Sequence, residues 1–362
     1  MDLVDIAGAR LANQRLVNPP SGRPEDVVSA LGAVQAQDYA GAKWALGLRL
    51  GGDTDADIER ALDQGRILRT HVLRPTWHFV APPDIRWMLA LTAPRVRAAM
   101  AYYDRQLDIT ERLCRRSQAV LTKALAGGNH LTREELGQAL ARAGIEARGP
   151  RLGNLMLRAE LDAVVCSGPR RGKQFTYALL DERAPAAPSR DRDEALAELA
   201  SRYFTSHGPA LVQDFSWWSG LTVNDAQRAA ALAGARLRAV TVAGRTFWRG
   251  ARARRATATT PAPVIHLLPS FDEYLVAYKD RDVVSDPAAS GRRDLGGPTP
   301  IANPFVLRAG RVVGTWRRSL EKKKVIVEVR PLVTLTARER RELGAAVLRL
   351  GAFLQRPSEL RP

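Results

Sequence analysis

Apolar and polar positions alternate most regularly in the middle of the chain. In HLTREELGQALARAG (residues 130–144), Thr132 stands three residues before Glu135, the spacing of a helix capping box, and leucines recur on one face of the helix that follows. A second helix is predicted from Pro150, because proline suits the first turn of a helix. Two β-rich runs around GPRRG (residues 168–172) predict a hairpin. Helix, helix and basic-tipped hairpin is the order of a winged helix, whose second helix can enter a groove of DNA.

This order recurs on both sides of the central unit. Between residues 209 and 250, Gly220 ends one predicted helix, Thr222 and Asp225 cap the next, and a hairpin follows. Near the N-terminus, apolar residues at helical spacing predict three helices, and two β-rich runs predict a hairpin. These four segments are residues 23–34, 40–50, 55–65 and 67–80. The pattern therefore predicts three tandem winged-helix units.

Two further stretches complete the predicted architecture. Residues 82–126 are expected to be helical and to connect the first two units, with Asp108 and Glu111 as a capping box. Residues 264–329 favour strands joined by hairpin turns, and residues 336–355 favour a last helix. The fold class is thus helix-rich α+β, with three winged-helix units and a small C-terminal β-rich domain. The predicted domains are residues 1–110 (first unit with bridging helices), 111–188 (second unit), 189–260 (third unit) and 261–362 (β-rich domain with the final helix).

Composition favours a nucleic-acid partner. The 362 residues carry a formal charge of +17, and such an excess attracts polyanions. Of the 55 basic residues 48 are arginines, which in an alanine-rich chain also reflects genomic composition bias. The two cysteines, Cys114 and Cys166, have no paired Cys/His spacing around them, so we expect core thiols and no metal site. No nucleotide-binding or dinucleotide-binding motif is found, no cofactor is expected, and no apolar run is long enough for a membrane span. We expect a cytoplasmic, nucleoid-associated monomer.

Gln35 and Gln37, in the run VQAQDYA, are the candidates for chemistry in the first unit. Residues two apart share a face only if the segment is extended, so both amides point the same way only if the preceding helix ends near Val34. From spacing alone, two glutamines at a helix end are more often solvated or bonded to backbone than catalytic. Asp38 beside them is a candidate base and equally an ordinary N-cap for the next helix.

Four stretches together closely resemble the winged-helix DNA-binding family to which the AlkZ-like DNA glycosylases belong. They are GAVQAQDYAGAKWALGLRL, RTHVLRPTWHFVAPPDIRWMLAL, HLLPSFDEYLVAYKDR and RVVGTWRR. The resemblance runs from about residue 5 to about residue 350. It implies an enzyme that excises N7-alkylated guanines and unhooks azinomycin-type interstrand cross-links. In that family a Gln-x-Gln motif is the catalytic signature, and Gln35 and Gln37 occupy it here.

The resemblance and the charge pattern together indicate further candidate site residues. His78 matches the family pattern on the first hairpin and is a candidate for active-site support, although a histidine in a strand is more often packed. Trp217 and Trp218 are interpreted as core residues. The candidates for DNA contact lie on the first hairpin, at the start of the predicted recognition helix, at the tip of the wing and on a late hairpin that also carries Lys322 to Lys324. They are Arg69, Arg74, Arg148, Arg151, Asn154, Arg170, Arg171, Lys173, Trp316, Arg317 and Arg318.

The sequence therefore predicts a cofactor-free, monofunctional DNA glycosylase that acts on alkylated or cross-linked double-stranded DNA. The alternative is a non-catalytic winged-helix DNA-binding protein or regulator. Such regulators are typically short dimers, and no coiled coil or ligand-sensing segment is visible here. An RNA-binding module is a weaker third candidate, because no aromatic signature of the RRM kind is present.

Overall fold

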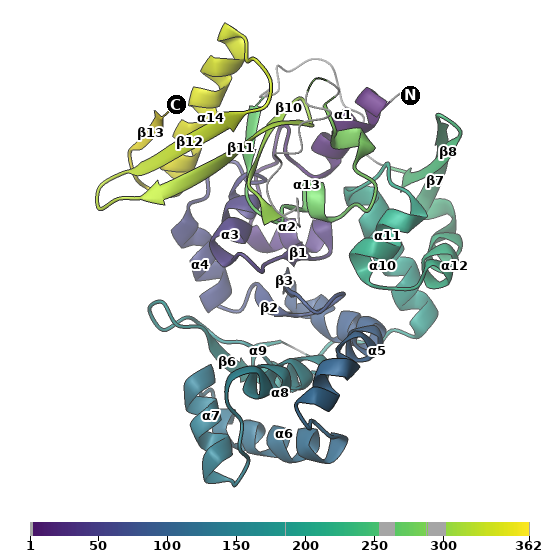
Figure 1. Cartoon of the computed structure of the whole chain (residues 1–362). Helices are drawn as coiled ribbons and strands as arrows, with labels where there is room; N and C mark the ends of the chain where they lie inside the picture. The colour runs from purple at the N-terminus through teal and green to yellow at the C-terminus, as the bar shows by residue number, and fades with distance from the viewer. Residues whose placement is uncertain (1–2, 185, 253–264, 287, 289–301, 362) are drawn as a thin grey trace.

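The computed structural model of the chain describes residues 3–184, 186–252, 265–286, 288 and 302–361 (Figure 1). Helices dominate, small antiparallel sheets lie between them, and a five-stranded sheet is formed by the C-terminal part. The predicted helix-rich α+β class with a C-terminal β-rich region is thus confirmed. Among the described residues, no helix is both long and apolar enough to cross a membrane.

The segment from residue 24 to residue 80 lies at the centre of the molecule (Figure 1). Its helices begin at residues suited to helix starts, because Pro24 occupies the first turn of one helix and Thr54 caps another. The three strands form one antiparallel sheet in the order β1-β3-β2. The elements are α2 (Pro24–Leu31), β1 (Val34–Gln35), α3 (Tyr39–Gly47), α4 (Asp55–Asp63), β2 (Leu68–His71) and β3 (Trp77–Val80).

A second segment with the same order of elements lies below the first in Figure 1. Thr132 and Glu135 form the predicted capping box, and the strands pair in the order β4-β6-β5, which is equivalent to that of the first sheet. The elements are α6 (Glu111–Leu125), β4 (Leu131–Thr132), α7 (Arg133–Arg142), α8 (Gly149–Leu161), β5 (Val165–Ser167), β6 (Thr176–Leu179) and α9 (Leu180–Arg183). The long helix α5 (Pro82–Gln106) connects the two segments.

The capping box predicted at Asp108 and Glu111 is wrong. The N-cap of α6 is Thr110, whose hydroxyl accepts a hydrogen bond from the N–H of Leu113. Asp108 instead has a φ of 51°, in the turn between α5 and α6. Aspartate tolerates this left-handed conformation, so Asp108 serves the turn and does not cap the helix.

A third segment lies on the right in Figure 1 and again consists of three helices followed by a hairpin. Ala210 pairs with Trp248 on β8 and so takes the place of a first strand. Gly220 ends α11 with a φ of 71°, and Thr222 caps α12, both as predicted. The elements are α10 (Arg192–Ser206), α11 (Val212–Ser219), α12 (Val223–Ala233), the 3-10 turn η1 (Gly234–Arg236), β7 (Leu237–Val242) and β8 (Arg245–Gly250).

The C-terminal part forms a sheet in the order β13-β12-β11-β10-β9, with helix α14 packed on it (Figure 1). The prediction of strands throughout residues 264–278 is wrong in its second half, because Asp272 caps a short helix there. The elements are β9 (Ile265–Leu268), α13 (Glu273–Val276), the 3-10 turn η2 (Asp282–Val284), β10 (Phe305–Arg308), β11 (Arg311–Leu320), β12 (Val325–Pro331), α14 (Ala337–Phe353) and β13 (Ser358–Arg361). The N-terminal helix α1 (Leu3–Asn13) lies beside this part.

The hydrophobic cores cross the segments. One core combines Val28 of α2 and Phe79 of β3 with Trp316 of β11 and Leu350 of α14. Another joins Met88 of α5 to helices α10 to α12. The central segment therefore shares its core with the C-terminal sheet. The predicted boundary between residues 260 and 261 lies outside the described residues, and the four-domain division stays a prediction.

Candidate active site

The Gln-x-Gln motif lies on an extended segment. Helix α2 ends at Leu31, and Gly32 follows with a φ of 85°, which turns the chain into β1. Gln35 then pairs with His78 of β3, and the N–H of Ala36 donates to the carbonyl of Trp77 at 2.7 Å. The condition set by the sequence, that the helix ends before the motif, is met. In an extended chain the side chains of residues 35 and 37 lie on the same face.

Gln35 is almost fully buried and is bonded at both its main chain and its side chain. Its N–H donates to Glu273 Oε1 at 2.7 Å, and its Oε1 accepts from Arg74 Nη2 at 2.7 Å. Because arginine has only donors, this contact assigns the carboxamide oxygen to the side of Arg74 and places the NH₂ group opposite. Among the described residues, that NH₂ group has no hydrogen-bond partner.

Gln37 and Asp38 are more accessible. Gln37 is exposed, and its Oε1 accepts a long hydrogen bond of 3.4 Å from the N–H of Trp77, with no second partner among the described residues. Asp38 is the N-cap of α3, with its Oδ1 accepting from the N–H of Gly41 at 3.1 Å. The N-cap interpretation of Asp38 is thus confirmed, whereas its use as a base stays a prediction.

His78 lies across the strand pair from Gln35 and is fully buried. Its Nδ1 is 2.9 Å from the carbonyl of Thr76, so Nδ1 carries the hydrogen and Nε2 is an acceptor. Nε2 is buried without a partner among the described residues. Burial, with a smaller contribution from the charge of Arg74, lowers the pKa of His78 to about 3. The ring is therefore neutral at physiological pH.

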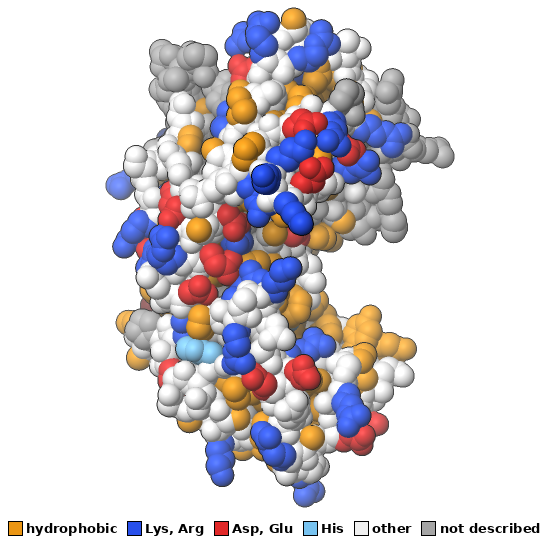
Figure 2. All heavy atoms as spheres, turned by 90° about the vertical axis from the view of Figure 1, so that its left-hand side faces the viewer, with side chains coloured by type: hydrophobic (Ala, Val, Ile, Leu, Met, Phe, Trp, Pro, Cys, Tyr) orange, Lys and Arg blue, Asp and Glu red, His pale blue; other side chains and the backbone are white. Residues whose placement is uncertain are grey.

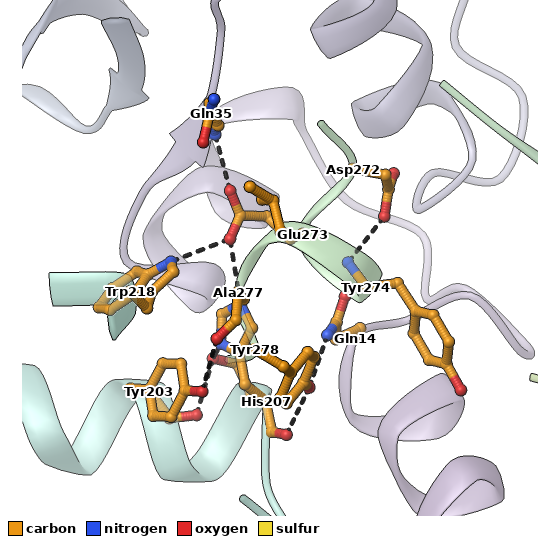
Figure 3. Close-up of polar contacts among 12 residues, drawn as sticks. Gln14, Gln35, Tyr203, His207, Trp218, Asp272, Glu273, Tyr274, Ala277 and Tyr278 are labelled. Atoms are coloured by element: carbon orange, nitrogen blue, oxygen red, sulfur yellow. Dashed lines mark hydrogen bonds and ion pairs between the residues drawn. The ribbon is translucent and has the colours of Figure 1, made fainter. Parts of the chain in front are cut away.

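Glu273 is a site residue that the sequence analysis did not single out. It is fully buried beneath Gln35 and also accepts a hydrogen bond from Trp218 Nε1 at 2.9 Å, while His207 Nε2 lies 3.4 Å from its Oε2 (Figure 3). Burial alone would raise the pKa of Glu273, but the hydrogen bond and charge of His207, helped by the N–H of Gln35, outweigh burial and lower it. The site thus contains a buried carboxylate. The signal in the sequence that could have indicated it is the acidic pair Asp272 and Glu273 inside an otherwise apolar run.

Neither arginine of the first hairpin projects freely into solvent. Arg69 is 9% exposed, donates from two nitrogens to the carbonyl of Ala36, and stacks against Trp77 and Phe175 at 4.3 and 4.7 Å. Burial lowers the pKa of Arg69 to about 10. Arg74 is half-buried against Gln35, and burial lowers its pKa as well. Both side chains hold the motif segment from inside.

The candidates in the second segment differ in how available they are. Arg148 is exposed at the N-cap of α8, and Arg151 and Asn154 are half-buried. Arg151 Nε and Asn154 Nδ2 are buried without a partner among the described residues. On the hairpin between β5 and β6, Arg170 lies beside Glu59 and Arg171 pairs with Glu135, while Lys173 is exposed. The N–O distances of the two pairs are 3.5 and 2.7 Å.

On the late hairpin, the prediction that Trp316 contacts DNA is wrong. Trp316 is 6% exposed, and its indole N–H donates to the carbonyl of Leu268 at 2.7 Å, so the ring belongs to the core and is not available for a DNA backbone. Arg317 is exposed and pairs with Glu328, and Arg318 is half-exposed. Figure 2 shows basic and acidic side chains interspersed on this side of the molecule, with a hollow at mid-height.

The tandem tryptophans differ from each other. Trp218 is fully buried, as the sequence analysis predicts. Trp217 is 40% exposed, and its indole N–H donates to the carbonyl of Val276 at 3.0 Å. Its ring lies 5.9 Å from the guanidinium of Arg74. The interpretation of Trp217 as a core residue is therefore wrong, and this partly exposed ring lies beside Arg74, the residue that bonds the side chain of Gln35.

A sequence model of the family described as DNA glycosylase AlkZ-like matches residues 28–353, which is most of the chain. The chain belongs to the AlkZ-like DNA glycosylase family. One AlkZ-like relative, from Streptomyces sahachiroi, is named an interstrand DNA cross-link repair glycosylase. It is 28% identical over 319 residues, covering 84% of this chain and 85% of the relative. The solved structure of the AlkZ glycosylase of the same organism matches all of both chains, with a TM-score of 0.79 and 24% identity, and so has the same fold.

Proposed function

We propose that the protein is a monofunctional DNA glycosylase that hydrolyses the N-glycosidic bond of N7-alkylated guanine, including guanine in interstrand cross-links. The observation that carries this proposal is the intact Gln-x-Gln motif on an extended strand, with one amide held firmly and the other exposed. Support comes from membership of the family and from the relative in S. sahachiroi that is named an interstrand DNA cross-link repair glycosylase.

The chemistry fits neutral side chains. Alkylation at N7 gives guanine a positive charge, so the base leaves with little need for an acid from the protein. The remaining tasks are to position water and to stabilise a sugar with oxocarbenium character. Carboxamides have donors and acceptors for both tasks without a shifted pKa. A cross-linked base is tethered to the opposite strand and cannot readily be flipped out, which favours a site that opens on the surface, such as that of Gln37.

We further propose that the three segments with equivalent strand order are winged-helix units that bind duplex DNA. In each segment the last strand of the hairpin (β3, β6 or β8) has two neighbours. One is the first strand of the hairpin (β2, β5 or β7), and the other is the short extended stretch before the second helix (β1, β4 or Ala210). Predicted phosphate contacts remain at the accessible residues of the second unit and of the late hairpin. They are Arg148, Arg151, Asn154, Arg170, Arg171, Lys173, Arg317 and Arg318. A monomer would suffice, because one chain supplies all three units.

The decisive experiment is incubation of the protein with a duplex that contains N7-methylguanine or an azinomycin-type cross-link, followed by alkaline cleavage at abasic sites. We expect strand cleavage at the lesion, and none with an undamaged duplex of the same sequence. Tight binding of the damaged duplex without an abasic product would support the alternative, a non-catalytic DNA-binding protein.

A further inference from the structure

Two charged residues from distant parts of the chain, the half-buried Arg74 and the fully buried Glu273, hold Gln35. We propose that Arg74 and Glu273 are positioning residues that fix the carboxamide of Gln35 with its oxygen turned away from the substrate and its NH₂ group turned toward it. Gln35 then acts as a hydrogen-bond donor. This inference deepens the proposed function and rests on it for the identity of the substrate.

Arg74 fixes the side chain. Its Nη2 donates to Gln35 Oε1 at 2.7 Å, and its guanidinium is flanked by the ring of Trp217 at 5.9 Å. The turn that carries it is itself anchored, because the N–H of Leu73 donates to Thr92 Oγ1 at 3.1 Å. A rigid turn lowers the entropic cost of holding the long arginine side chain in place.

Glu273 fixes the main chain of the same residue. Its two oxygens accept hydrogen bonds from the N–H of Gln35 and from Trp218 Nε1, at 2.7 and 2.9 Å, and all three groups are buried (Figure 3). Hydrogen bonds to a buried carboxylate are stronger than neutral ones. The opposite charges of Arg74 and Glu273 attract each other, and this attraction partly offsets the effect of burial on the pKa of Arg74.

The fixed orientation divides the work between the two glutamines. A donor NH₂ can bind the oxygen of a water molecule or an acceptor atom of the lesion, but it cannot accept a hydrogen bond from the attacking water. The proton that this water releases passes to solvent. A hydrogen-bond acceptor that orients this water must come from elsewhere. The oxygen of Gln37 is available, because its single bond among the described residues is a long one. Gln35 is thus the hydrogen-bond donor with a fixed orientation, and Gln37 is the loosely held hydrogen-bond acceptor.

The first test is a double-mutant cycle on single-turnover excision of N7-methylguanine. Arg74→Met should lower the rate by about 10- to 100-fold, the scale expected for a misplaced contact, while the Kd for the duplex changes less than about 2-fold. In a Gln35→Ala background, Arg74→Met should cause no further loss, because it acts through Gln35. Arg74→Lys should restore part of the rate. Additive losses, or a Kd that rises equally for damaged and undamaged duplex, would overturn the inference in favour of a phosphate contact.

The second test addresses the donor role. Gln35→Glu keeps an oxygen facing Arg74 and replaces the NH₂ donor with an acceptor, so its rate should be as low as that of Gln35→Ala. A rate equal to that of the parent would show that an acceptor suffices and would contradict the assignment.

A readout without activity separates this inference from the proposed function. With glutamine labelled in its side-chain amide, the NMR signal that disappears in Gln35→Ala reports the environment of this NH₂ group. Arg74→Met and Glu273→Gln should each shift it, whereas Lys173→Met on the wing should not. If both variants show these shifts but the parent protein excises no N7-methylguanine, the proposed function fails and the positioning stands. An unshifted signal in both variants refutes the positioning.

Discussion

At the scale of single residues, the difference in exposure between Gln35 and Gln37 governs what substitution should do. Gln37 is exposed and, within the part of the chain that the structure describes, makes a single long hydrogen bond, so Gln37→Ala should leave the fold and the duplex affinity intact. If its amide positions the attacking water, the single-turnover excision rate should fall by about 10- to 1,000-fold. An unchanged rate with normal binding would make the motif structural and leave Asp38 as the alternative base.

The pH dependence also belongs to this scale. Glutamine amides do not titrate, and the pKa of His78 is lowered to about 3, so excision should be nearly independent of pH between 6 and 9. The structure thus removes the sigmoid near pH 6.5 that a solvent-exposed histidine base would produce. Rates measured across this range in buffers of constant ionic strength provide the check. A sigmoid with a midpoint inside this range would reveal a titrating base and contradict the proposed chemistry.

Stability should respond to acid in a defined direction. Burial lowers the pKa of His78 to about 3 and that of His266 to about 4, while an unfolded histidine titrates near 6.5. Between these values the unfolded chain binds more protons, so stability should be full above about pH 6.5 and should fall as the pH drops below it. The measurement is the midpoint of thermal unfolding between pH 8 and pH 5. A midpoint that rises on acidification would contradict the buried, neutral state of these rings.

At the scale of elements, the turn that carries Arg74 depends on the end of helix α11. Gly220 has a φ of 71°, and a Cβ there would lie 2.2 Å from the carbonyl oxygen of Leu73. Gly220→Ala should therefore cost stability from backbone strain and also displace the turn, lowering both the unfolding midpoint and the excision rate. Gly244→Ala is a matched control, because Gly244 has a φ of 74° but open space around its Cα. Equal effects on unfolding and no effect on excision in either variant would show that the contact is unimportant.

Local signals predicted many elements, because the physics that sets them is local. The capping box at Thr132 and the glycine stop at Gly220 depend on neighbours a few residues away. The segment of helix α13 is predicted to be a strand because its residues favour β-structure. It forms a helix instead, because the Asp272 cap and burial override that preference. The site shows the same division: the Gln-x-Gln motif could be recognised, whereas the inward direction of Arg74 and the role of Glu273 depend on long-range contacts.

At the scale of the whole molecule, the charge of +17 should make duplex binding sensitive to salt and nearly independent of sequence. Each neutralised phosphate contributes about −0.9 to the slope of log K against log salt. Titrations of an undamaged duplex at several salt concentrations give this slope directly. Because several basic residues are already paired with acidic ones, as Arg171 is with Glu135, we expect fewer contacts than the net charge suggests. A slope of zero would exclude electrostatic docking.

The hydrogen bond between Gln35 and Glu273 joins residues that are 238 positions apart. On a ribosome that adds about 5 to 20 residues each second, the strand that carries Gln35 would leave the exit tunnel roughly 10 to 50 seconds before its carboxylate partner. Until then the strand lacks the group that holds its main chain, and Arg74 lacks a counter-charge. The nascent protein can therefore fold its first two segments, with their basic side chains, well before the surroundings of Gln35 are complete.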